Sequence, residues 1–397
     1  MKPRRASPRS PTSAAMQELS RLASGLADSS SRIEDAFWEN RLAAEIQRAL
    51  RAGNDETLVT ALDHLDNAHP EGHDELIYAI ESAIECNVLT QTHDGKNAPY
   101  DVLLFAVPIV AWSRFSIPTG KLDTPLLNNL RVHLEAHVLA KEARLSLADC
   151  VFSPEQLPHG YHKMHALAAG LWAAAMAGEH RIVPITPLSI DEDDQPLSDS
   201  RYLLGAVAVP SGQPMFRWQE ADGTKEAALG AWQAQASECL RGYFQGCAFE
   251  LLLPDGFFSA WRMADRVGRA YALRASVDFL QSEAGIAARD LRAVIASFQD
   301  GWMQEYRVSF TRTDQNNVLF GVVWPLMEEE EEAQSAIKAQ IESTLHACGV
   351  SNIVLLKGDF PLDFCDDCDA PLFADPEGKI VHAELPEAGD EIPRHLH

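Results

Sequence analysis

Tyr306–Arg312 (YRVSFTR), Asp314–Asn317 (DQNN) and Val318–Pro325 (VLFGVVWP) form the stretch that decides the fold of this chain. The first and third segments are rich in β-branched and aromatic residues, which favour strands. Between them, the Asp, Gln and Asn residues are typical of a tight turn. The stretch therefore predicts a β-hairpin.

One strand and one helix flank this hairpin on each side. Before it, we expect a strand over Leu273–Leu280 and a helix over Ala287–Phe298. After it, we expect a helix over Glu328–Ala347 and a strand over Asn352–Leu356. The order βαββαβ is that of the ferredoxin-like split βαβ arrangement, which we assign to residues 270–358. The chain is thus predicted to be an α+β protein.

Residues 98–269 predict an α/β region in which similar strand–helix–strand cycles occur twice. Apolar runs predict the strands, and amphipathic periodicity predicts the helices. The first cycle comprises Val102–Ala106, Leu126–Ala143, Leu145–Phe152 and Met164–Ala177, and the second comprises Tyr202–Val209, its hairpin partner Pro214–Gln219, Lys225–Arg241 and Ala248–Leu253. The last strand of each cycle ends near a proline, Pro154 or Pro254. The match indicates either an internal duplication or one economical supersecondary unit used twice.

The N-terminal part predicts a helical module over residues 16–97. Leucines recur at helical spacing between Met16 and Cys86, interrupted by turn residues at Gly53 and around Pro70. Residues 1–15, rich in Pro, Arg and Ser, predict a disordered basic leader.

Residues 359–397 contain the clearest chemical motif. Cys365 and Cys368 form a Cys-x2-Cys pair, and a hairpin around Pro376 and Gly378 would bring His382 back beside it. Two thiolates and an imidazole are three of the four ligands of a tetrahedral zinc site, which is usually structural. Asp369, which tolerates a left-handed backbone, takes the place often held by glycine.

The fourth zinc ligand is open among several residues. The candidates are Glu384, Glu387, His395, His397, Cys348, His346 and water. A redox-active cysteine pair is a competing interpretation, but the surrounding aspartates would raise the thiol pKa values. A third interpretation is a pair of unligated cysteines on a surface tail.

The loop after the first strand is the best sequence candidate for ligand binding. Arg114, Ser116, Thr119 and Lys121 could bind a carboxylate or phosphate at a strand end, although an ordinary polar connection has the same composition. His133 and His137, one helical turn apart, could chelate a metal, or could be an unliganded helix face.

Composition narrows the class of partner. The formal net charge is −25, with 58 acidic and 33 basic residues, and four of the 33 basic residues lie within the first nine positions. A chain with this much negative charge repels phosphates and anionic lipids. We therefore expect that it binds neither nucleic acids nor membranes.

The cysteine spacing indicates the cellular location of the protein, and the motifs missing from the sequence disfavour common enzyme classes. Seven irregularly spaced cysteines do not form a disulfide framework, and no secretory signal or membrane-spanning run occurs, so we expect a cytoplasmic protein. Glycine-rich phosphate loops, Gly-x-Gly-x-x-Gly and Gly-x-Ser-x-Gly are absent from the sequence, which disfavours familiar nucleotide-dependent enzymes and serine hydrolases.

Several segments together resemble one family. They are Ser31–Asp35 with Phe37–Glu39, Ala111–Pro118, Tyr202–Val207, Phe249–Pro254 and Cys365–Pro386. They resemble an uncharacterised bacterial domain-of-unknown-function family of about 400 residues with no assigned activity, so the resemblance implies no catalytic residue. We expect a binding or scaffold protein with a structural zinc ion, its partner an unknown protein or a small anionic ligand. The alternative is an enzyme acting on a small anionic substrate at the Arg114 loop.

Overall fold

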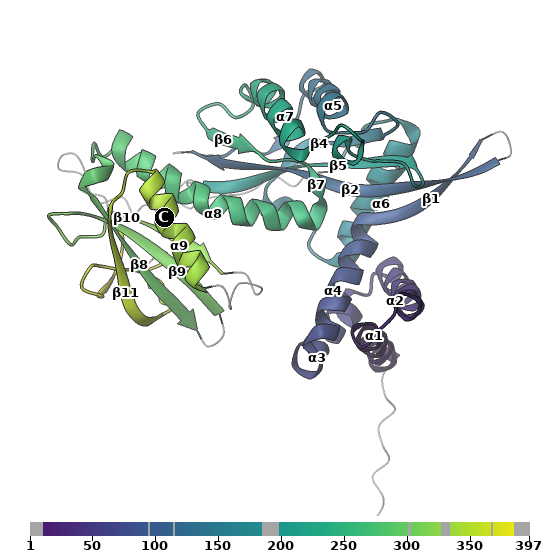
Figure 1. Ribbon diagram of the computed structural model, residues 1–397, viewed down its shortest axis with the longest axis horizontal. Helices are drawn as coiled ribbons and strands as arrows, with labels where there is room; N and C mark the ends of the chain where they lie inside the picture. The colour runs from purple at the N-terminus through teal and green to yellow at the C-terminus, as the bar shows by residue number, and fades with distance from the viewer. Residues whose placement is uncertain are drawn as a thin grey trace, which may run out of the picture.

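The computed structural model describes residues 11–93, 96–113, 116–184, 198–300, 303–326, 334–366 and 368–384 (Figure 1). It is a mixed α and β protein, as expected. In the part described, no helix is both long and apolar enough to cross a bilayer.

Four helices form the N-terminal module. They are α1 (Pro11–Ala27), α2 (Arg32–Ala52), α3 (Asp55–Ala68) and α4 (Pro70–Glu85). Local signals set their ends: the Ser31 side chain caps α2, Gly53 ends it with φ 67°, and Asn54 caps α3. The helices expected between Met16 and Cys86 are therefore confirmed. The leader prediction is wrong for residues 11–15, where α1 has already begun at a proline, a favoured first helical residue.

A large sheet follows directly. Its strands are β1 (Cys86–His93), β2 (Lys96–Trp112), β3 (Gly120–Lys121), β4 (Arg144–Phe152), β5 (Ser198–Pro210), β6 (Ala248–Leu251) and β7 (Asp255–Gly256). The order is β1-β2-β5-β4-β3, and β6 and β7 pair with β2. Residues 86–93 and 96–97, which we grouped with the helical module, thus contribute strands to this sheet.

Helices cover both faces of the large sheet, as Figure 1 shows. On one face, α5 (Thr124–His137) packs against α7 (Lys225–Leu240); the other carries α6 (Tyr161–Ala177) and the first half of α8 (Phe257–Ser282). Side chains along β2 alternate accordingly: Leu104 and Ala106 face α6 and α8, whereas Phe105 and Val107 face α5 and α7.

The two predicted cycles are related by an approximate twofold axis. Strands β2 and β5 are central and antiparallel; β4 lies antiparallel beside β5, and β6 lies antiparallel beside β2. Exchanging β2 with β5, β4 with β6, α5 with α7 and α6 with α8 preserves the pairing of these four strands and the face of the sheet on which each helix lies. Two copies of one unit would have this relation.

One element of the second cycle was predicted wrongly. Pro214–Gln219 is not a hairpin partner of β5: it contributes a single bridge from Phe216 to Leu139 and a short 3-10 helix, Arg217–Gln219. Pro214 favours a turn here, and the backbone amides of Met215 and Phe216 stabilise it by donating hydrogen bonds to Oε1 of Gln219 (2.7 and 2.9 Å).

A small sheet, ordered β10-β9-β8-β11, forms the C-terminal part. Its elements are β8 (Leu291–Asp300), β9 (Met303–Arg312), β10 (Phe320–Pro325), α9 (Gln334–Ala347) and β11 (Asn352–Pro361), and β11 runs parallel to β8. The hairpin expected between Tyr306 and Pro325 is confirmed as β9 and β10. The second half of α8 packs with α9 on this sheet.

The βαββαβ prediction is wrong. Leu273–Leu280 lies within α8, and most of Ala287–Phe298 is the strand β8, so the order is αβββαβ. Strand β8 is buried on both faces. Ile295 lies under α8 and α9, and Phe298 lies under the C-terminal segment, by which we mean the described residues after β11 (362–366 and 368–384). Double burial removes the alternation of apolar and polar residues that marks a strand, and Ala, Arg and Leu favour helix. Residues 328–333 of the second expected helix lie outside the described residues.

Candidate functional site

The Cys365 turn is built by the backbone. The amide of Cys365 donates to the carbonyl of Ala370 (2.8 Å), and the amide of Asp369 donates to the carbonyl of Cys365 (2.9 Å). Asp369 adopts φ 55°, the left-handed conformation expected of it. The turn therefore places Cys365 and Cys368 on the same side of a tight loop.

The expected hairpin is present as β12 (Phe373–Ala374) and β13 (Ile380–Val381). The Asp375 carboxylate accepts hydrogen bonds from the amides of Glu377 and Lys379 (both 2.9 Å), and Gly378 completes the turn with φ 83°. His382 directly follows β13, so the hairpin returns its imidazole to the cysteines.

Cys365, Cys368 and His382 form a group that could hold a metal ion. Their ligand atoms lie within 4.8 Å of one another. The Sγ atom of Cys368 is 3.3 Å from Nε2 of His382, close to the separation of about 3.6 Å that tetrahedral zinc imposes on a sulfur and a nitrogen ligand. All three residues are half-buried.

A backbone carbonyl sets the tautomer of His382. Its Nδ1 lies 3.0 Å from the carbonyl oxygen of Ala383. Because a carbonyl only accepts, Nδ1 would carry the proton of a neutral imidazole, and Nε2, the nitrogen beside Cys368, would carry the lone pair that a metal requires. This is the orientation that metal-ligating histidines receive from a neighbouring acceptor.

A fourth ligand from Cys, His, Asp or Glu does not join the group among the residues that the structure describes. This covers the candidates Cys348, His346 and Glu384. The candidates Glu387, His395 and His397 lie outside the described residues.

A buried arginine attaches the C-terminal segment to the small sheet. Arg307 on β9 donates from Nη1 to the carbonyls of Asp363 (2.7 Å) and Leu372 (2.6 Å), and pairs with Glu305 (2.6 Å). Its guanidinium lies over the rings of Phe298 and Phe364. The Ser309 hydroxyl adds a bond to the carbonyl of Ala374 (2.5 Å). The segment thus covers the face of the sheet opposite α9.

The predicted anion loop is described in part. Arg114 lies outside the described residues, Ser116 is exposed and Thr119 is half-buried. The Lys121 ammonium pairs with Asp149 (2.7 Å) and donates to the carbonyl of Val183 (2.8 Å). An anion at Lys121 would therefore have to compete with a carboxylate already in place.

The two histidines of α5 are neighbours without a further ligand in the described part of the chain. The rings of His133 and His137 stack with centroids 5.9 Å apart. No Cys, Asp, Glu or third His among the residues described completes a metal-binding group with them.

Sequence reasoning missed a pocket of about 810 Å³ between the helical module and the starts of α6 and α8. Both helices begin alike, with Pro158-His159-Gly160-Tyr161 at α6 and Pro254-Asp255-Gly256-Phe257 at α8. The repeated Pro-x-Gly-aromatic pattern was the signal in the sequence that could have pointed there.

A carboxylate from the helical module caps each of these two helices. Neither N-cap glycine has a side chain to do so. Instead, the amide of His162 donates to Asp55 of α3 (2.9 Å), and the amide of Phe258 donates to Glu85 of α4 (3.2 Å). A negative group at the positive end of a helix is stabilising. The second residue of each of the two corresponding helices therefore donates its amide to a carboxylate of the helical module.

Both N-cap glycines make room for the carboxylates. A Cβ at Gly160 would lie 2.5 Å from Oδ2 of Asp55, and one at Gly256 would lie 3.0 Å from Oε1 of Glu85. Gly160 also adopts φ 101°, which side chains disfavour.

The two capping carboxylates differ in their surroundings. Asp55 also receives Nδ1 of His162 (2.7 Å). Burial raises the pKa of Glu85 to about 7. The hydrogen bond from the Phe258 amide lowers this pKa, because it favours the ionised form, but it is the weaker of the two effects. The charge of the α8 cap therefore changes near neutral pH.

The chain belongs to a protein family of unknown function, DUF2863, whose model matches residues 4–396. This confirms the resemblance to an uncharacterised family. No curated protein and no solved structure matches the chain.

Proposed function

We propose that this member of the DUF2863 family is a binding or scaffold protein whose C-terminal segment is clamped to the small sheet by a structural zinc ion. The ligands would be Cys365, Cys368 and His382. The observation that carries the proposal is the convergence of their three ligand atoms within 4.8 Å.

The chemistry of the donors favours zinc. Two thiolates and a neutral imidazole suit zinc better than magnesium or calcium, which prefer oxygen ligands. A redox role is less well supported, because no helix begins at these cysteines and Asp366 and Asp369 flank them.

A structural role agrees with the position of the group. The metal would link the Cys365 turn, which follows β11, to the β12–β13 hairpin. Arg307 binds beside both, at the carbonyls of Asp363 and Leu372. The binding role is supported by the pocket of about 810 Å³, a volume within the usual range for small-molecule sites.

Metal content and stability test the proposal together. We expect one zinc ion per chain by elemental mass spectrometry in the wild type, and none in the Cys365→Ser/Cys368→Ser variant. Free zinc at a hundredfold excess over its dissociation constant would stabilise the folded wild type by about 2.7 kcal/mol and leave the variant unchanged.

The control is Cys239→Ser, on α7, which should keep both the zinc and the response to added zinc. Zinc retained by the double variant, or a wild-type protein that binds none when zinc is supplied, would refute the clamp.

A further inference from the structure

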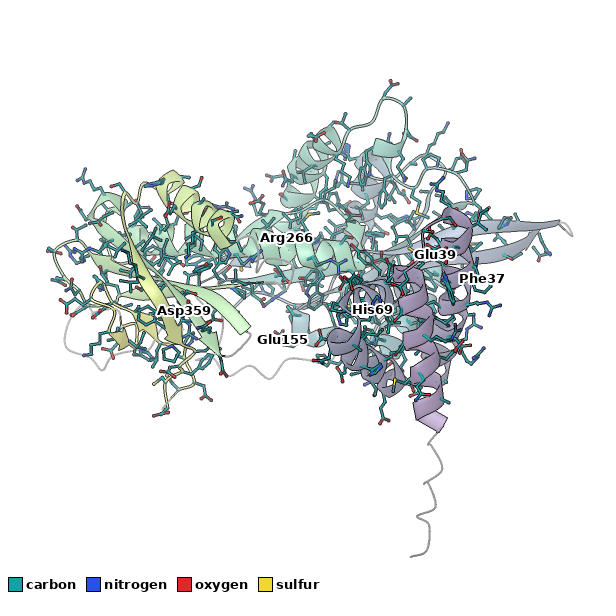
Figure 2. All side chains as sticks on the ribbon, turned by 60° about the horizontal axis from the view of Figure 1, so that its bottom comes forward. Phe37, Glu39, His69, Glu155, Arg266 and Asp359 are labelled. Atoms are coloured by element: carbon teal, nitrogen blue, oxygen red, sulfur yellow. The ribbon has the colours of Figure 1, made fainter. Side chains whose placement is uncertain are left out.

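The pocket between the helical module and the large sheet is assembled from five segments of the chain. Asp55 opens α3, Glu81 lies near the end of α4, Tyr161 opens α6 and Trp261 lies in the first turns of α8. The segment between β4 and α6, which includes Glu155, completes the wall. Glu155, labelled in Figure 2, lies in that view between His69 of the helical module and Asp359 of the small sheet.

Most of the wall is apolar and aromatic. Tyr161, Phe258 and Trp261 line it, and Trp261 is fixed by stacking on Tyr202, with centroids 5.3 Å apart and an interplanar angle of 11°. Aromatic rings carry negative π density on their faces and therefore attract cations. An apolar body with a positive group would satisfy such a wall.

The charged residues of the wall are mainly acidic. Asp55, Glu81 and Glu155 are carboxylates, and Arg262 is the single Arg or Lys in the described lining. His159 also lies in the wall, and Glu85 lies against the start of α8 beside it.

The one arginine is already neutralised. Glu81 accepts Nη1 of Arg262 at 2.8 Å and Nη2 at 3.0 Å, a bidentate pair. Asp55 already contacts Nδ1 of His162 at 2.7 Å. Glu155 accepts only a neutral donor in the contacts described, the Ser153 hydroxyl (2.6 Å), and its side chain is exposed. Glu155 therefore supplies uncompensated negative charge at the mouth of an aromatic pocket.

We propose that this pocket binds a small organic cation with an apolar or aromatic body, its positive group near Glu155 and its body against Tyr161 and Trp261. The proposal deepens the binding role proposed above by naming a ligand class, and it does not depend on the zinc ion. A carboxylate or phosphate ligand would instead meet three acids and an occupied arginine.

Three probes of one shape and different charge test the proposal by calorimetric titration at pH 7.5. They are 3-phenylpropylamine, which is cationic, 3-phenylpropan-1-ol, which is neutral, and 3-phenylpropanoate, which is anionic. We expect the amine to bind about tenfold more tightly than the alcohol, as one charge-assisted contact of about 1.4 kcal/mol provides, and the anion most weakly.

Variants locate the site. Glu155→Gln should weaken the amine about fivefold to tenfold and leave the alcohol unchanged, while Glu238→Gln, on α7 across the sheet, should change neither. Trp261→Leu should weaken both probes. Arg262→Met, which frees the Glu81 carboxylate, should tighten the amine.

The opposing outcomes are distinct. Equal binding of amine and alcohol, a preference for the anion, or no binding of any probe at about 5 mM would each overturn the proposal. The same titration with Cys365→Ser/Cys368→Ser should give wild-type affinities, so a failure of the metal clamp and a failure of this site give different results.

Discussion

Two segments are attached to two sheets by opposite chemistry. The helical module meets the large sheet where its carboxylates, Asp55 and Glu85, cap α6 and α8. The C-terminal segment meets the small sheet through a cation, Arg307, which donates to its carbonyls beside the cysteine and histidine group. The first attachment should respond to pH and the second to metal, because different groups bear the charge in each.

The largest effect is expected at the C-terminal attachment. Arg307→Met removes a fully buried guanidinium and leaves Glu305 buried without its partner. Breaking a buried ion pair on one side costs about 3 to 5 kcal/mol, so the free energy of unfolding in urea should fall by about that amount.

The matched control for this variant is Arg312→Met. Arg312 lies on the same strand and pairs with Asp314, but its side chain is 42% exposed, so its loss should change stability by about 0.5 kcal/mol or less. Similar losses in the two variants would show that Arg307 does not anchor the segment.

A smaller effect is expected at the helix starts. Gly160→Ala places a Cβ against Asp55 in a backbone conformation with φ 101°, and should cost about 2 kcal/mol. Hydrogen exchange at the first amides of α6 should rise, because the cap is displaced.

Gly230→Ala is the control for the helix-start variant. Gly230 is exposed within α7, and a Cβ at this position would have no neighbouring atom within 4 Å, so the alanine should stabilise the helix by about 0.5 to 1 kcal/mol. A Gly160→Ala protein as stable as the wild type, with unchanged exchange, would remove the proposed need for glycine.

The smallest effect depends on pH. Because the pKa of Glu85 is raised to about 7 in the folded protein, that state holds a proton which the unfolded chain releases above about pH 4.5. The free energy of unfolding should therefore fall as the pH rises from about 4.5 to 7. Glu85→Gln should abolish this fall and be about 1 to 2 kcal/mol more stable than the wild type at pH 8, with no difference at pH 4.5.

The exposed Glu179→Gln variant should keep the wild-type pH profile. If Glu85→Gln lowered stability at pH 8, the ionised carboxylate would be a net stabilising cap. The expected loss of stability at the attachment of the helical module with rising pH would then be wrong.

Comparison with the sequence predictions shows which features are local. Strands β4, β5 and β9, helices α6 and α7, the Cys365 turn and the β12–β13 hairpin were all predicted close to their observed bounds. The signal for each lies within a short stretch of sequence, as in the Asp375 turn, where one carboxylate accepts from two amides two and four residues ahead.

The errors lie where distant contacts decide. Leu273–Leu280 is apolar enough for a strand, but it continues a helix that covers both sheets. Strand β8 lost its alternation because the C-terminal segment, about 75 residues later, buries its second face. Short apolar runs are ambiguous until their neighbours are known.

By itself, the sequence determined the mixed α and β class, the cysteine and histidine group and the repeated cycle, because residue type and spacing alone create periodicity and ligand sets. Only the tertiary structure decided the twofold pairing of the cycles and the aromatic, acid-lined pocket. The capping bonds beside that pocket join residues 107 and 173 positions apart. Such contacts form because two helix ends and two carboxylates must be satisfied at once when the layers pack, and no local pattern records that requirement.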